Sequence, residues 1–202
     1  RDFLDKIGLD SYQEGDCGPI YGYQWRSFNK PYKKESDFNG IDQLNNIIHL
    51  INNDPMSRRM IMTGWNPCQL KEMVLPPCHV LYQFYVNICE KTGEKLLSCQ
   101  MYQRSGDLFL GVPFNIASTA LLTYIIANIT NIKPKSISII LGDAHIYCDH
   151  IEAVKTQLSR KPYLFPKLHI CNDYKHIDDV KYEDLKLSDY TCHAKISAKM
   201  IA

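Results

Sequence analysis

The longest stretch without a charged side chain, residues 108–132, constrains the fold of this chain most strongly. It is long enough to span a bilayer, but it contains a glycine, a proline and several asparagines, serines and threonines, and charged residues resume directly after it. A helix in the core of a globular protein explains this composition better than a membrane span does. We therefore expect a central buried helix over Pro113 to Asn131, with the proline near its first turn, where a missing N–H costs nothing.

Segments rich in β-branched and aromatic residues predict strands on both sides of this helix. They cover residues 60–65, 80–88, 96–102 and 136–141. A polar, glycine-containing segment at 91–95 predicts a hairpin between the second and third of these strands.

Apolar residues at three- and four-residue steps over 41–51 predict an amphipathic helix that ends at Asp54-Pro55, and a second helix is expected over 149–158. No repeat, linker or low-complexity tract divides the chain. The sequence predicts one α+β domain over residues 1–202, in which helices pack on a mixed or antiparallel sheet.

The overall charge and the cysteines restrict the classes of function. With 23 basic and 22 acidic residues, the net charge gives no support to a nonspecific nucleic-acid or membrane-surface role. The eight cysteines are irregularly spaced without a Cys-x-x-Cys pair, and a chain of this size does not need a disulfide framework. Nothing in the sequence has the pattern of a signal peptide. We expect free thiols in a reducing, cytoplasmic compartment.

Cys78 is the first candidate for chemistry, because it follows two prolines that stiffen the entrance to a predicted strand. Most buried cysteines are inert, whereas a reactive one needs a nearby cation or helix N-terminus that lowers the thiol pKa. The hairpin should bring Arg104 alongside Cys78 as such a cation. Two interpretations of Cys78 therefore remain open, a nucleophile and an inert core residue. His79 should point to the opposite face of the strand, which favours a supporting hydrogen-bonded histidine over a Cys–His ion pair.

Two arginine clusters, Arg58-Arg59 and Arg104-Ser105, lie beside predicted strands. Surface salt bridges are the usual explanation for such pairs. Guanidinium groups near a sheet also suit a phosphate or carboxylate that is bound through two hydrogen bonds. We expect an anion site that involves these residues.

Two polar segments suggest how a nucleoside could be bound. His145 and Tyr147 alternate onto one face of an extended segment, where both could donate to a sugar hydroxyl. Asn115 either caps the buried helix or presents its amide to a uracil-like edge, since the amide offers a donor and an acceptor. A metal site at His145, Cys148 and His150 is not expected, because these offsets share no helix or strand face.

These features together suit a nucleotide substrate, and the chain resembles thymidylate synthase. The resemblance runs nearly the whole length and is carried by residues 14–26, 57–61, 65–67, 75–79, 83–86, 102–107, 110–118 and 142–147. It implies a mixed sheet packed with helices, with the sheet at a dimer interface. It also implies conversion of dUMP and 5,10-methylenetetrahydrofolate to dTMP and dihydrofolate, with folate as co-substrate and no metal.

The resemblance assigns the pyrimidine site to five residues. Cys78 would attack C6 of the uracil ring and so make C5 nucleophilic toward the folate methylene. Tyr21 would assist removal of the C5 proton through ordered water. Asn115 would hydrogen-bond the uracil edge, with Gln103 and His79 in support.

The phosphate site follows from the arginine clusters. In the family pattern, Arg104 and Ser105 would hold the dUMP phosphate, and Arg104 would also favour the Cys78 thiolate. Arg58 and Arg59 would reach the same phosphate from the partner subunit of an obligate homodimer.

The remaining assignments concern the ribose and the folate. His145 and Tyr147 would bind the ribose 3′-hydroxyl. Asp107 would take part in catalysis, contact the substrate and contact the folate pterin, and Gly111 would let the ring approach the backbone. The C-terminal tail, which ends at Ala202, would fold over the bound ligands.

Several alternatives accompany this interpretation. The family's N-terminal segment, with an arginine loop and a catalytic glutamate, has no counterpart here, so we expect part of a longer chain, such as a reductase–synthase fusion, with weak activity alone. A deoxycytidylate hydroxymethylase shares the cysteine chemistry, but those enzymes tend to carry aspartate where this chain has Asn115. A catalytically incomplete fragment or an RNA-binding module is the third alternative, and the near-neutral charge argues against a dedicated RNA binder.

Overall fold

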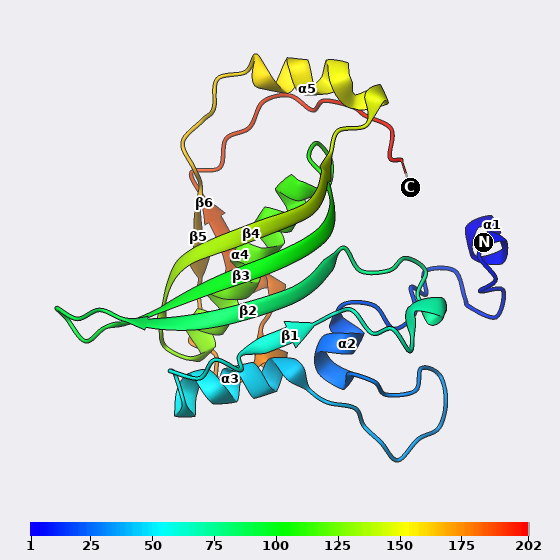
Figure 1. The fold of residues 1–202 in the computed structure, drawn as a ribbon. Coiled ribbons are helices and arrows are strands. Elements are labelled where there is room, and N and C mark those ends of the chain that lie inside the picture. The colour runs from blue at the N-terminus through cyan, green and yellow to red at the C-terminus, as the bar shows by residue number, and fades with distance from the viewer. Residues whose placement is uncertain (202) are drawn as a thin grey trace.

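The computed structural model describes residues 1–201, apart from the side chain of Phe3. The main sheet has the strand order β1-β2-β3-β4 (Figure 1). β1 (Ile61–Thr63), β2 (His79–Ile88) and β3 (Lys95–Asp107) are antiparallel neighbours, whereas β4 (Lys133–His145) runs parallel to β3. A parallel pair needs a crossover connection, and α4 (Val112–Ile129) provides it. The predicted α+β fold with a mixed sheet is confirmed.

The strands differ in length from their predictions. β3 and β4 each extend to the polar residues at their carboxyl ends, because the parallel pairing continues until Asp107 lies opposite His145. β1 is shorter than the predicted 60–65, because only residues 61–63 pair with β2. The extensions place five of the candidate site residues on the strands themselves, namely Gln103, Arg104, Ser105, Asp107 and His145.

The other helices are shorter than α4. α1 (Asp2–Lys6) and α2 (Gly22–Ser27) precede α3 (Gln43–Asn53), which Asp42 caps by accepting from the backbone N–H of Asn45 at 2.9 Å. The predicted helix at 149–158 is divided into a 3₁₀ turn, η2 (Cys148–His150), and α5 (Ile151–Leu158). The other 3₁₀ turns are η1 (Leu70–Glu72), η3 (Ile177–Asp179) and η4 (Tyr182–Asp184), and β5 (Lys167–Ile170) pairs with β6 (Leu185–Ser188).

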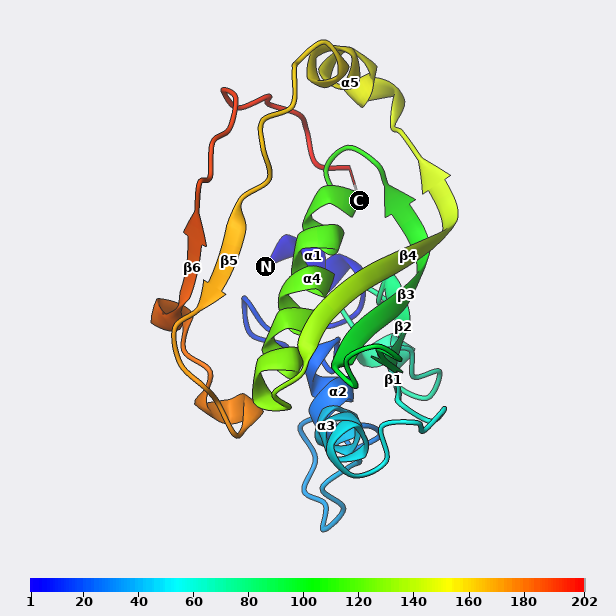
Figure 2. The same cartoon turned by 90° about the vertical axis from the view of Figure 1, so that its left-hand side faces the viewer.

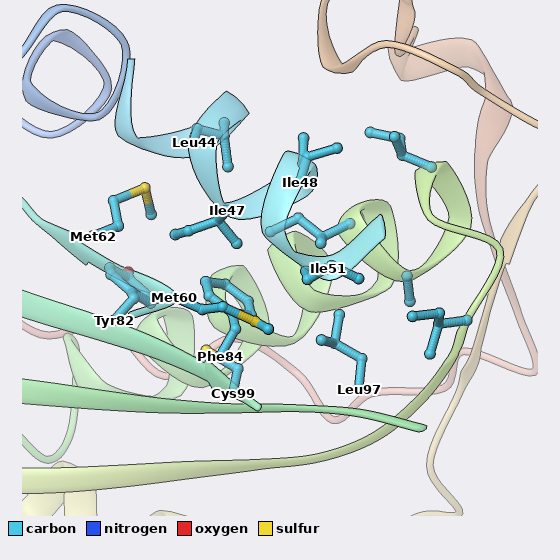
Figure 3. Packing of buried hydrophobic residues seen from close by; sticks show 14 of the residues in the cluster. Leu44, Ile47, Ile48, Ile51, Met60, Met62, Tyr82, Phe84, Leu97 and Cys99 are labelled. Atoms are coloured by element: carbon cyan, nitrogen blue, oxygen red, sulfur yellow. The ribbon is translucent and has the colours of Figure 1, made fainter. Parts of the chain in front are cut away.

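The main core lies between the inward face of the sheet and the two helices α3 and α4 (Figure 3). Leu44, Ile47, Ile48 and Ile51 form the apolar face of α3 that the sequence predicts. Opposite them lie the buried strand residues Met62, Tyr82, Phe84 and Leu97, together with Met60 directly before β1. This packing removes large apolar side chains from water and fixes the β2–β3 hairpin, whose ends carry the site.

α4 is helical as predicted, but the prediction of a central buried helix is wrong for one of its faces. One face packs on β3 and β4, while Phe114 is 75% exposed and Ile116 is 46% exposed. Figure 2 shows β5 and β6 on the side of α4 away from the sheet, as a thin outer layer. By length and apolar composition alone α4 could cross a membrane. Its contacts with both parallel strands instead make it the crossover helix of a β–α–β unit.

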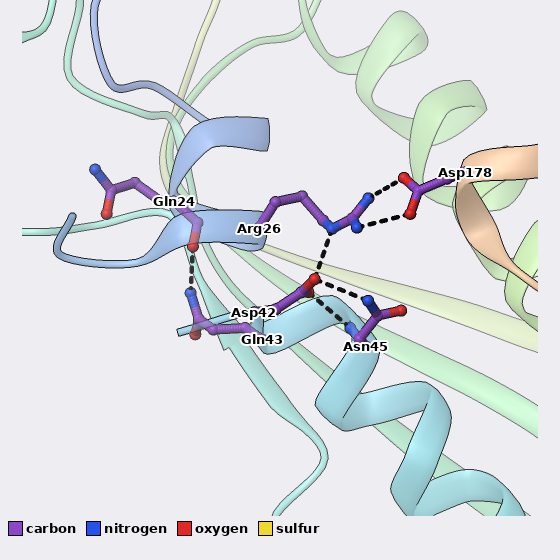
Figure 4. A network of polar contacts seen from close by, with 6 residues as sticks. All are labelled: Gln24, Arg26, Asp42, Gln43, Asn45 and Asp178. Atoms are coloured by element: carbon purple, nitrogen blue, oxygen red, sulfur yellow. Dashed lines mark hydrogen bonds and ion pairs between the residues drawn. The ribbon is translucent and has the colours of Figure 1, made fainter. Parts of the chain in front are cut away.

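A polar network joins the N-terminal and C-terminal parts of the chain (Figure 4). Arg26 of α2 donates from Nε to Asp42 at 2.9 Å and from Nη1 to Asp178 of η3 at 2.6 Å. The same ion pair holds the pKa of Asp178 below its usual range. The network anchors the segment that contains η3 beside the start of α3.

Candidate active site

The β2–β3 hairpin brings Arg104 to Cys78. His79 pairs with Gln103 in the register, and the Arg104 backbone N–H donates to the Cys78 carbonyl at 2.9 Å. The Arg104 Nη2 atom then lies 4.0 Å from the Cys78 sulfur. Cys78 is half-buried, so its thiol is held next to a cation without being sealed from a ligand.

The prolines before Cys78 orient this arginine. Arg104 Nε donates to the Pro77 carbonyl at 2.9 Å, and Nη2 donates to the Pro76 carbonyl at 2.8 Å. The guanidinium also lies 5.5 Å from the centre of the Trp65 ring, within cation–π range. Three contacts therefore fix the plane of the guanidinium. No sequence pattern indicates that Trp65 packs against Arg104.

Tyr21 contacts Cys78 from the other side. The Cys78 backbone N–H donates to the Tyr21 hydroxyl at 3.0 Å, and the Tyr21 ring lies 5.4 Å from that of His79. Burial raises the pKa of Tyr21, which keeps its hydroxyl protonated. Its φ of 30° is in a region that non-glycine residues rarely occupy, as is common at functional sites.

His79 is buried and does not form an ion pair with Cys78. Its Nδ1 lies 2.8 Å from the Tyr82 hydroxyl, while Nε2 has no hydrogen-bond partner among the described residues. Burial lowers the pKa of His79, so its ring is neutral at physiological pH. The sequence did not indicate Tyr82 as its partner, because that residue reads only as part of an apolar strand.

Asn115 faces the sheet and does not cap α4. The residue before the helix is Gly111, and no side-chain cap is present there. Gln103 instead donates from Nε2 to Asn115 Oδ1 at 2.9 Å and to the Ser105 carbonyl at 2.9 Å. Since an amide oxygen has two lone pairs, Asn115 keeps one acceptor position and its NH₂ donors for a ligand.

The parallel β3–β4 register assembles the second half of the site. Ser105 lies opposite Asp143 and Asp107 opposite His145. The rings of His145 and Tyr147 are 5.0 Å apart, which puts both on one side of the segment after β4. A side chain at Gly111 would meet the Asp107 backbone oxygen at 3.2 Å, so glycine fits the close approach between this loop and β3.

Two of the expected contributors lie elsewhere. Arg58 and Arg59 are exposed and precede β1, whose residue Ile61 pairs with Gln83. The strand pair therefore puts them toward the end away from Cys78, and they do not join its cluster. The expectation for Ala202 falls outside the described residues.

A hollow of about 660 Å³ lies beside the site and was not predicted from the sequence. It is lined on one side by Phe109, Leu110, Pro113 and Phe114, and on the other by the loop that follows α5, including Arg160, and by the C-terminal segment. Its size and mostly apolar lining suit a flat organic ligand. Segments distant in sequence form it, which explains why no local pattern indicated it.

The cysteines and possible metal ligands complete the inventory of reactive groups. All eight cysteines are free within the described part of the chain. Among those same residues, no group of three or more His, Cys, Asp or Glu side chains could hold a metal ion.

Comparison with known proteins gives one consistent result. A family model described as Thymidylate synthase matches residues 3–202. The chain is 53% identical to thymidylate synthase of Homo sapiens and 49% identical to that of Saccharomyces cerevisiae, over 99% of its length in both cases. It spans 63% of the human protein and 68% of the yeast protein. It is also 50% identical to the bifunctional dihydrofolate reductase-thymidylate synthase of Paramecium tetraurelia, of which it covers 42%.

Proposed function

Because this chain belongs to the thymidylate synthase family, we propose that it catalyses the reductive methylation of dUMP to dTMP with 5,10-methylenetetrahydrofolate as co-substrate. Residues 1–202 act as one thymidylate synthase domain in this proposal, in the cytoplasm. The observation that supports it most directly is the 4.0 Å approach of the Arg104 guanidinium to the Cys78 sulfur.

Cys78 is the proposed nucleophile. Its thiolate sulfur forms a bond to C6 of the uracil ring, and the electron pair of the C5–C6 double bond moves toward O4 as an enolate. C5 thereby becomes the carbon that accepts the one-carbon unit. Arg104 holds a positive charge beside the sulfur, and the backbone contacts of Cys78 with Tyr21 and Arg104 fix the direction of attack.

Tyr21 is the proposed assistant for the C5 proton. Its hydroxyl oxygen accepts from the Cys78 N–H and keeps a second lone pair, with which it accepts from ordered water near the ring, so that this water can take the C5 proton. The raised pKa keeps the Tyr21 hydroxyl protonated, and the neutral His79 ring next to it can bind the same water, which passes the proton on to solvent.

Asn115 is the proposed reader of the pyrimidine edge. Uracil presents an N–H donor and a carbonyl acceptor, which match the free lone pair and the NH₂ group of Asn115. The hydrogen bond from Gln103 holds this amide in one orientation. A cytosine edge reverses the pattern at the exocyclic position, so the geometry favours dUMP over dCMP.

The phosphate and the ribose are assigned to the adjacent carboxyl ends of β3 and β4. Arg104 and Ser105 would bind the phosphate, the former through guanidinium donors that the proline carbonyls do not use. His145 and Tyr147, whose rings lie together, would bind the ribose 3′-hydroxyl.

Folate would lie over Asp107 and Gly111, along the adjacent hollow. The absence of a side chain at Gly111 and the apolar lining of the hollow suit the approach of a flat ring. When bound, folate supplies the one-carbon unit and the hydride. The tail that ends at Ala202 would cover it.

The proposed active unit is a homodimer formed through the outward face of the sheet. Tyr85, Tyr102 and Ile140 on this face are 50%, 40% and 46% exposed, which is unusual for large apolar residues in the middle of a sheet. Arg58 and Arg59 lie away from their own Cys78, which supports their assignment to the partner's phosphate site.

Covalent trapping tests the proposal. The protein is incubated with 5-fluoro-dUMP and methylenetetrahydrofolate, and the intact mass is measured for wild type, Cys78→Ala and the control Cys89→Ala, which changes a cysteine at the hairpin tip. We expect an adduct in wild type and Cys89→Ala and none in Cys78→Ala. A folded, dimeric wild type without an adduct would overturn the proposal in favour of a catalytically incomplete fragment.

A further inference from the structure

His150 is a buried polar residue that the proposed mechanism does not use. It is the last residue of η2 and is fully buried, with 0% of its surface exposed. Its ring packs between Phe109 and Tyr147, at 5.5 Å from each. Since Tyr147 also contacts His145, the imidazole lies directly behind the proposed ribose site.

One nitrogen of this ring holds the C-terminal tail. His150 Nε2 lies 2.7 Å from the Lys199 carbonyl oxygen. A carbonyl only accepts, so Nε2 must carry a proton and donate it. The tail passes beneath α5 (Figure 1), where Arg160 donates to the Ala194 carbonyl at 2.6 Å. In the described part of the chain, the His150 contact is the side-chain hydrogen bond furthest along the tail.

The other nitrogen faces the folate end of the proposed site. His150 Nδ1 has no hydrogen-bond partner among the described residues, and it lies 3.9 Å from an Asp107 carboxylate oxygen. That separation is too long for a hydrogen bond. A buried ring nitrogen without a partner is unfavourable, and phenylalanine would fill the same volume without it. Packing alone therefore does not account for an imidazole at this position.

We propose that His150 is a positioning residue that couples the C-terminal tail to Asp107. Its Nε2–H fixes the tail at Lys199, and its Nδ1 edge lies against the Asp107 carboxylate. A movement of the tail therefore shifts the ring relative to Asp107. The importance of this coupling for turnover rests on the proposed function, whereas the anchoring of the tail does not.

Hydrogen–deuterium exchange of the ligand-free protein tests the anchor. His150→Phe keeps an aromatic ring between Phe109 and Tyr147 but removes the donor, whereas His150→Gln places an amide N–H near the position of Nε2. We expect the backbone amides of residues 196–201 to exchange about 2- to 10-fold faster in His150→Phe, the range that one neutral hydrogen bond supports. His150→Gln should exchange within about twofold of wild type, because the donor is restored. His169→Phe, which replaces an exposed histidine, should leave the tail unchanged.

Two results would overturn the proposal. One is exchange of the tail amides at the wild-type rate in a folded His150→Phe protein, and the other is exchange in His150→Gln as fast as in His150→Phe. If His150→Phe does not fold, a chain ended after Ala198 removes the acceptor instead. That chain should show a higher folate KM than wild type with a dUMP KM within about twofold, and an unchanged folate KM would contradict the coupling.

Turnover assays separate this inference from the proposed function. With an active protein, His150→Phe should raise the folate KM more than the dUMP KM, and His150→Gln should restore it. If tail exchange depends on His150 but the protein does not turn over dUMP, the proposed function is refuted and the anchoring of the tail still holds. If the protein turns over dUMP but tail exchange is the same with and without His150, the anchoring is refuted and the proposed function still holds.

Discussion

Replacing Tyr21 by phenylalanine separates two roles that the structure gives to its hydroxyl. The hydroxyl accepts from the Cys78 backbone N–H at 3.0 Å, and it is the proposed hydrogen-bond partner of the water that removes the C5 proton. Phenylalanine keeps the ring against His79 and leaves only these two contributions missing. The substitution does not require a change in the backbone conformation of residue 21, whose φ is 30°.

The two contributions differ in size. An unpaired Cys78 N–H in this half-buried position costs about 1–2 kcal/mol in positioning, or about 5- to 30-fold in the rate of sulfur attack. Loss of general acid–base assistance costs about 10²- to 10⁴-fold. Turnover of dUMP should therefore fall by at least about 10²-fold in Tyr21→Phe, whereas attack at C6 should slow much less.

5-Fluoro-dUMP distinguishes the two because fluorine replaces the proton that Tyr21 would help to remove. Adduct formation is followed by intact mass in single-turnover experiments, and turnover of dUMP is measured in parallel. We expect adduct formation within about 5- to 30-fold of wild type and a far larger loss of turnover. Equal losses in both assays would show that Tyr21 only positions Cys78, and no loss in either would refute both roles. Tyr23→Phe, two residues further along in the first turn of α2, is the matched control.

Three further predictions follow from the same geometry. Mixing Cys78→Ala protomers with Arg58→Ala/Arg59→Ala protomers should restore about a quarter of wild-type activity. Half of the randomly formed dimers are hybrids, and each hybrid has one complete site out of two. No recovery of activity would refute an active site shared between the two subunits. Asn115→Asp should shift the ratio of kcat/KM from dUMP toward dCMP by about 10- to 100-fold in a competition assay, since a mismatched buried hydrogen bond costs about 1–3 kcal/mol. Burial lowers the pKa of His79 from 6.5, so the unfolded state takes up the proton first, and the unfolding free energy should fall as the pH drops below about 6.5. In denaturant titrations, the unfolding free energy of His79→Gln should fall less steeply with decreasing pH than that of wild type. An equal fall in both proteins would contradict a buried neutral ring at His79.

Local patterns predicted the parts of the fold that depend on neighbouring residues. The spacing of apolar residues located α3, and the β2–β3 hairpin placed Arg104 beside Cys78 because strand pairing across a short turn has little freedom. The exposed face of α4 was not predictable in the same way. Its apolar residues are distributed all round the helix, so the composition indicates burial without showing which side packs against a neighbour.

The contacts of His150 could not be predicted from the sequence. The sequence offers His150 only as a candidate metal ligand, because His145 and Cys148 lie nearby in the sequence. Its actual partners are a tail carbonyl at Lys199 and a carboxylate at Asp107, both more than forty residues away. A backbone carbonyl leaves no signal in the sequence, so a side chain that bonds to one cannot be predicted from residue types.

Arg104 shows how the structure adds a second reason for a residue type. As an anion binder it could be exchanged for lysine, since both carry a positive charge. In the structure, Nε bonds the Pro77 carbonyl while Nη2 bonds the Pro76 carbonyl and approaches the Cys78 sulfur. Lysine has one nitrogen and cannot make these contacts from separate atoms of a rigid plane. The prolines contribute more than stiffness here, because a residue without an N–H still offers its carbonyl, and these two carbonyls hold the cation that faces the thiol.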